Sequence, residues 1–146
     1  MNWSRIVAAG VVAWLASMAV GFLVNDVLLV DLAAPNLAVM RPEADIMTKL
    51  PIGFAGTLAA FLAFAYMYAR GYEGGSGLHE GIRFGFVAGV VVCGFGVVWF
   101  YVAYPITATY GAAMVVDWLA ESTIYGAVVG SIYRPAAKPA AVVAAI

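Results

Sequence analysis

Residues 82–133 read IRFGFVAGVVVCGFGVVWFYVAYPITATYGAAMVVDWLAESTIYGAVVGSIY, and their only charged side chains are Arg83, Asp117 and Glu121. A single helix of this length would extend about 78 Å, whereas about 20 residues cross the hydrocarbon core of a membrane. The stretch therefore predicts two membrane spans. Pro105 marks the break between them, because proline disfavours helix in the residue before it and can begin a new helix.

Two more apolar segments of spanning length precede this stretch. The chain is 65% hydrophobic and 10% charged, whereas soluble domains carry about 25% charged residues. We expect an all-α, integral membrane protein with a single four-transmembrane-helix bundle in residues 1–135 and an Ala- and Pro-rich tail in 136–146. The expected spans are residues 6–30, 50–69, 82–104 and 107–133. The first apolar run is too long for the core of a signal peptide, so we expect it to be retained.

The basic residues predict how the spans are oriented. Five of them flank one side and two the other: Arg5, Arg70, Arg83, Arg134 and Lys138 against Arg41 and Lys49. Because the side richer in Lys and Arg faces the cytoplasm, we expect an up-down-up-down bundle with both termini cytoplasmic. In the outer loop, residues 42–45 (Pro-Glu-Ala-Asp) are expected to form a first helical turn. The apolar side chains of Ile46 and Met47 would let a short helix lie in the membrane interface.

Small residues at four-residue spacing predict close helix packing. Gly85 and Gly89 in the third span, and Gly126 and Gly130 in the fourth, follow this pattern, which lets membrane helices approach closely. An internal seam between the two spans and a contact between two copies of the chain both fit the pattern.

Two acids in the fourth span are the strongest functional lead. Asp117, Glu121 and Tyr125 are spaced four residues apart and share one helix stripe, and a carboxylate at this depth is costly. Two carboxylates one turn apart should not both be charged there, so a shared proton is expected. One interpretation is a proton-relay or cation site that Asn25 and Asp26 continue. Another is structural: the acids are protonated, or hydrogen-bonded to Ser17, Asn25, Thr57 or a neighbouring subunit. A third is that they pair with an Arg or a cofactor of another protein.

The sequence argues against several function classes. A single cysteine and a single histidine leave no set of ligands for a multi-histidine metal site or a bis-histidine haem. None of the common catalytic spacings is present, and the net charge of −1 argues against nucleic acid as a partner. We therefore expect a protein that is not an enzyme and that binds no cofactor or metal.

The last two predicted spans share sequence features with other membrane proteins. Residues 81–135 begin GIRFGF and end YGAVVGSIYRP, and this arrangement resembles small uncharacterised bacterial membrane proteins with four helices. The resemblance implies a four-helix fold in the bacterial inner (cytoplasmic) membrane and carries no activity.

Two functions remain open from the sequence. The first is an accessory or structural subunit of a larger membrane complex of respiratory or photosynthetic type, with membrane lipids and other membrane-protein subunits as partners. The alternative is a small proton-coupled transporter or channel that acts as a homo-oligomer, with Asp117 and Glu121 as its proton site.

Overall fold

The computed structural model describes residues 1–133, and every regular element in that range is a helix. Four helical stretches are long and apolar enough to cross a membrane: Trp3–Leu28, Glu43–Gly71, Gly77–Ala103 and Ala108–Ile132. The all-α class is confirmed, and these stretches support a multi-pass membrane protein. The expected tail, residues 136–146, lies outside the described residues.

Two of the four stretches contain a π-helical turn. The first consists of α1 (Trp3–Phe22) and the π turn η1 (Leu23–Leu28). Short α2 (Val30–Ala33) and the 3-10 helix η2 (Ala34–Val39) lead to the second, α3 (Glu43–Gly71). The third is made of α4 (Gly77–Val92), the π turn η3 (Cys93–Val97) and α5 (Val98–Ala103), and the fourth is α6 (Ala108–Ile132).

The second long helix begins at Glu43 and not at the expected Leu50. The expected short interfacial helix is thus the first part of α3. The Asp45 carboxylate accepts hydrogen bonds from Arg41 at 2.6 Å and from Lys49 at 2.8 Å. These ion pairs, one turn apart, support a helix that continues outside the apolar part of the segment.

The break between the third and fourth stretches lies at Pro105, as predicted. Tyr104 before it is extended, with φ −119° and ψ 141°, which is the conformation that a following proline favours. Thr107 then caps α6, because its hydroxyl accepts a hydrogen bond from the Tyr110 amide at 3.3 Å.

Helices α4 and α6 touch through their backbones. A Cβ placed on Gly126 would collide with the carbonyl oxygen of Gly81 and the Cα of Gly85, and one on Gly130 would collide with Gly77. A Cβ on Gly89 would lie 3.0 Å from the Ser122 Cβ. The structure thus brings the four expected packing glycines into one seam inside the chain.

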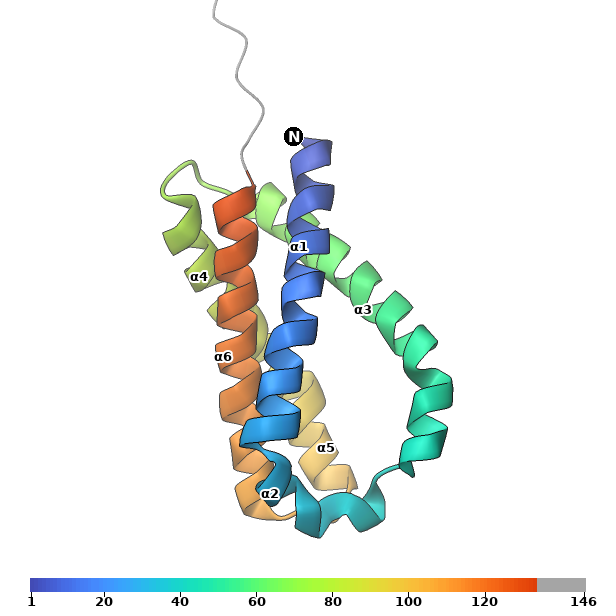
Figure 1. Cartoon of the computed structure of the whole chain (residues 1–146). Coiled ribbons are helices and arrows are strands. Elements are labelled where there is room, and N and C mark those ends of the chain that lie inside the picture. Colours follow the sequence, from blue (N-terminus) through green and yellow to red (C-terminus); the bar gives the residue numbers. More distant parts are fainter. Residues whose placement is uncertain (134–146) are drawn as a thin grey trace, which may run out of the picture.

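The buried core lies at the end of the molecule that holds the start of α1 and the ends of α3 and α6 (Figure 1). Its buried members are Ile6, Ala9, Ala13, Ala65, Tyr68, Ala69, Val129 and Tyr133. The Tyr68 ring meets the Tyr133 ring edge-on at 6.0 Å, and its hydroxyl donates to the Gly77 carbonyl at 2.9 Å. Toward the other end α3 turns away from α1 (Figure 1), while Cys93, Val97 and Tyr110 are buried in the third and fourth stretches.

At the other end of the bundle, a buried asparagine connects the loop after the first long helix to the start of α6. Asn36 in η2 is only 3% exposed. Its Oδ1 accepts a hydrogen bond from the Thr107 amide at 2.8 Å, and its Nδ2 donates to the Leu32 carbonyl at 2.9 Å. The side chain therefore fastens the connection between the first two long helices to the start of α6.

The seam predicts that Gly126→Ala destabilises the protein although it adds only one methyl group. The backbones must separate to admit the Cβ, and overpacking of this kind costs about 1–3 kcal/mol in free energy of unfolding. Thermal unfolding in a mild detergent, followed by circular dichroism, measures the change. Gly56→Ala is the matched control, since no described atom lies within 4 Å of a Cβ at that position. Equal stability of the two variants would contradict the seam.

We expect Asn36→Ala to lower the free energy of unfolding by about 1–3 kcal/mol, because the Thr107 amide and the Leu32 carbonyl lose their partner. Asn25→Ala is the control: Asn25 is exposed and its Nδ2 donates only to the Gly21 carbonyl of its own helix, at 3.0 Å. Denaturant unfolding should separate the two variants. If both behave alike, Asn36 does not hold the loop to α6.

Candidate functional site

The stripe of Asp117, Glu121 and Tyr125 lies near the middle of α6. Asp117 is 9% exposed and Tyr125 is 8% exposed, and Glu121 is partly buried. At 1.5 Å per residue, Glu121 lies about 20 Å from the first residue of α6 and about 17 Å from the last. The structure thus holds a hydroxyl and two carboxyl groups far from both ends of the helix.

Both carboxyl groups have a buried oxygen atom without a partner. Within residues 1–133, neither Asp117 Oδ1 nor Glu121 Oε1 makes a hydrogen bond. A buried unpaired polar group costs about 1–3 kcal/mol, and an unpaired charge costs more. Each acid therefore requires a proton or a partner that the described chain does not provide.

Two nearby hydroxyl groups were expected as hydrogen-bond partners for these acids, and the structure uses them elsewhere. The Ser17 hydroxyl donates to the Trp14 carbonyl at 2.7 Å. The Thr57 hydroxyl donates to the Gly53 carbonyl at 3.0 Å and accepts from the Trp14 indole at 3.1 Å. Both protons are thus committed to the backbone of their own helices.

Two pockets meet at Glu121. One, with a volume of about 260 Å³, lies between α3, α4 and α6. The other, of about 360 Å³, lies between α1, α3 and α6 and includes Ser17 and Thr57. Phe61, Glu121 and Tyr125 line both pockets, and the rings of Phe61 and Tyr125 meet edge-on at 5.1 Å.

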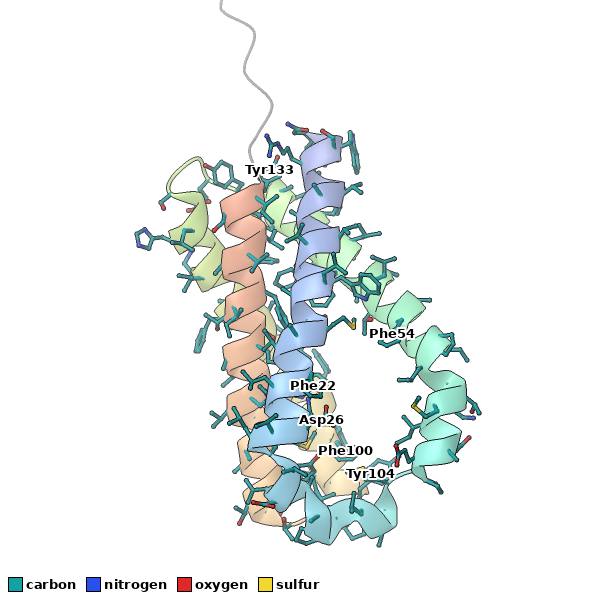
Figure 2. All side chains as sticks on the ribbon, viewed as in Figure 1. Phe22, Asp26, Phe54, Phe100, Tyr104 and Tyr133 are labelled. Atoms are coloured by element: carbon teal, nitrogen blue, oxygen red, sulfur yellow. The ribbon has the colours of Figure 1, made fainter. Side chains whose placement is uncertain are left out.

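Asn25 and Asp26 do not join this site. They lie in the π turn η1 at the end of the first long stretch, where both are exposed. Figure 2 shows Asp26 near Phe22 on this part of the chain, and Phe54 on α3 where that helix has turned away from α1. Neither Asn25 nor Asp26 lines either of the two pockets at Glu121.

Sequence reasoning missed the aromatic side chains around Glu121. Trp118 lines the first pocket together with Phe61 and Phe64. Trp118 precedes Glu121 by three residues on one helix, and this spacing places the two side chains on one face. The two phenylalanines come from α3, and no local pattern links them to α6.

The remaining ionisable and thiol groups form no second site in the described part of the chain. No group of three His, Cys, Asp or Glu side chains there is placed to hold a metal ion. His79 is exposed at the start of α4, and Cys93 is buried, 6% exposed, against α6. The chemistry of the site is therefore that of two carboxyl groups, a phenol and aromatic rings in an apolar setting.

Comparison with known proteins adds no family to this description: no family model, curated protein or solved structure matches the chain.

Proposed function

We propose that this protein is a non-catalytic accessory or structural subunit of a larger membrane complex. The observation that carries the proposal is the course of α3. Within the described chain, no residue from Glu43 to Phe64 is buried. A helix that only faces lipid on one side buries its other side against its own bundle. Phe61 and Phe64 pack against the core of this bundle, whereas every residue in 51–57 is exposed.

The open part of α3 also has the small residues that packed membrane helices use. No described atom lies within 4 Å of a Cβ placed on Gly53 or Gly56, although glycines in membrane helices commonly mark close approach of a second helix. The Trp14–Thr57 hydrogen bond lies next to them, where α3 leaves α1. A membrane helix of another subunit, seated against Gly53 and Gly56, would complete the packing.

We further infer an up-down-up-down course with both termini on the cytoplasmic side of a bacterial inner membrane. The five-to-two distribution of Lys and Arg supports this orientation, and the resemblance to bacterial four-helix proteins supports the location. Small size and the absence of catalytic spacings favour a supporting role in a complex of respiratory or photosynthetic type, in contact with membrane lipids.

This proposal predicts that Gly56→Leu releases a partner subunit. The larger side chain fills the space that the partner helix needs, so a protein recovered in stoichiometric amount with the tagged wild-type chain in mild detergent should be lost. The measurement is affinity purification from native membranes followed by mass determination of the intact complex. The variant should keep its unfolding temperature, because no atom outside the local helix backbone lies within 4 Å of a Cβ at position 56.

Gly21→Leu is the matched control, since Gly21 is equally open but lies on α1. A partner lost from both variants, or from neither, would count against the α3 surface. Recovery of the wild-type chain as a lone monomer, or bound only to a second copy of itself, would refute the accessory role.

A second function has its own support in the two carboxyl groups, each of which has one buried oxygen without a hydrogen-bond partner in the described chain. Acids at this depth commonly serve as proton sites in transporters, and Glu121 lies where two pockets meet. We keep a proton-coupled transporter or channel, acting as a homo-oligomer, as the alternative to the accessory role.

The alternative predicts that Glu121→Gln abolishes proton flux. Glutamine keeps the size of the side chain but cannot release a proton, so liposomes with an internal pH dye should show no flux above the protein-free level. Glu43→Gln, an exposed position at the start of α3, should transport like the wild type. If the wild type itself moves no protons, or if Glu121→Gln changes only stability or partner binding, the acids are not a transport site.

A further inference from the structure

The pocket between α3, α4 and α6 combines one carboxyl group with four aromatic rings. Phe61 and Phe64 come from α3, and Trp118 and Tyr125 come with Glu121 from α6. Apart from the Ser122 and Tyr125 hydroxyls, the other lining groups are apolar. Aromatic faces attract cations, most strongly where water is excluded, and the carboxylate supplies the opposite charge. The lining therefore matches a ligand with an apolar body and one positive charge.

No ion pair in the described part of the chain involves this carboxylate. Arg41 and Lys49 pair with Asp45, and Arg83 pairs with Glu73 at 2.7 Å. These ion pairs belong to the ends of the long helices, whereas Glu121 lies in the middle of α6. Within residues 1–133, Glu121 is therefore a carboxyl group without an ion pair.

The position of the pocket limits how that molecule arrives. On one side the rings of Phe64 and Phe84 close the contact between α3 and α4, with centroids 4.7 Å apart. The glycine seam closes the contact between α4 and α6. Since Glu121 lies about 17 Å or more from either end of α6, the headgroup of a lipid in the surrounding bilayer does not reach it. The open route is lateral, from the hydrocarbon region, so the ligand must itself be lipophilic.

The size of the pocket sets an upper limit to the ligand. Its volume is about 260 Å³, just below the range of about 300–1,000 Å³ that is usual for ligand sites. A single aromatic ring with a small substituted ammonium group is within this size. We propose that the pocket around Glu121 binds a small lipophilic organic cation, whose ammonium group pairs with the Glu121 carboxylate and packs against the surrounding rings. This binding site goes beyond the accessory role and does not depend on it.

The test uses benzyltrimethylammonium, which carries a permanent charge and can neither donate nor accept a proton. Isothermal titration calorimetry on the full chain in a non-ionic detergent should show saturable binding at one site per chain. Neopentylbenzene has the same shape without the charge and should not compete at equal concentration. We expect Glu121→Gln to weaken binding at least about tenfold, while Glu43→Gln, which also removes one acid, should bind like the wild type.

A second pair of variants separates the rings from the charge and decides the question if Glu121→Gln fails to fold. Trp118→Leu removes a ring from the pocket and should weaken binding at least about threefold. Trp99→Leu removes an equally large ring that is 63% exposed on α5 and should change nothing. The proposal is overturned if the wild type shows no saturable binding, if the neutral isostere competes equally well, or if the members of either variant pair behave alike. Because ligand binding is measured on the isolated chain, its failure leaves the accessory role standing, and the reverse also holds.

Discussion

Direct backbone contact between α4 and α6 is the constraint on which the rest of the structure depends. In a membrane, helices gain little from hiding apolar side chains, because lipid tails are equally apolar, and close packing supplies much of the association energy. Gly81 and Gly85 face Gly126 so closely that even a Cβ would not fit. This seam fixes how α6 is rotated about its axis. The glycine face of α6 packs against α4, and Glu121 and Tyr125 line the pockets that α6 forms with α1, α3 and α4.

The same need for close packing explains why α3 contacts the other helices closely at one end of the molecule and not at the other. At one end, small residues on α1, such as Ala9 and Ala13, let α3 and α6 converge, and tyrosine rings fill the remaining space. Toward the other end α3 has no seam of its own with the described chain. Its contact with α1 ends near Thr57, and the first half of the helix stands apart (Figure 1). Glu121 lies beside the part of α3 where the helix begins to leave the bundle. The two pockets on either side of Glu121 form there because α3 no longer packs closely against the other helices.

The four spans were predictable because a membrane requires each spanning helix to have a certain length and an apolar composition. Both can be recognised in the sequence without knowledge of any tertiary contact. Pro105 was predictable for a similarly local reason, since its ring constrains Tyr104 directly. The helical start at Pro42 was also predictable, from the acids of the first turn. The continuation of that helix into the second span was not predicted, because the segment around Asp45 is polar; there Asp45 forms ion pairs with Arg41 and Lys49. The burial of Asn36 was also not predictable, because its partner Thr107 lies far along the chain.

For the candidate site, the sequence by itself determined that Asp117, Glu121 and Tyr125 share one stripe of a membrane helix, because helical geometry and the cost of buried charge are local properties. Only the tertiary structure decided what surrounds that stripe. It placed Phe61 and Phe64 of α3 beside Glu121, left Asn25 and Asp26 apart from it, and committed the Ser17 and Thr57 hydroxyls to their own helices. The physical reason is that helix rotation and tilt follow from the fit of whole surfaces, here the glycine seam and the aromatic end of the bundle. Residues distant in sequence build those surfaces together, and no segment of the chain contains that information alone.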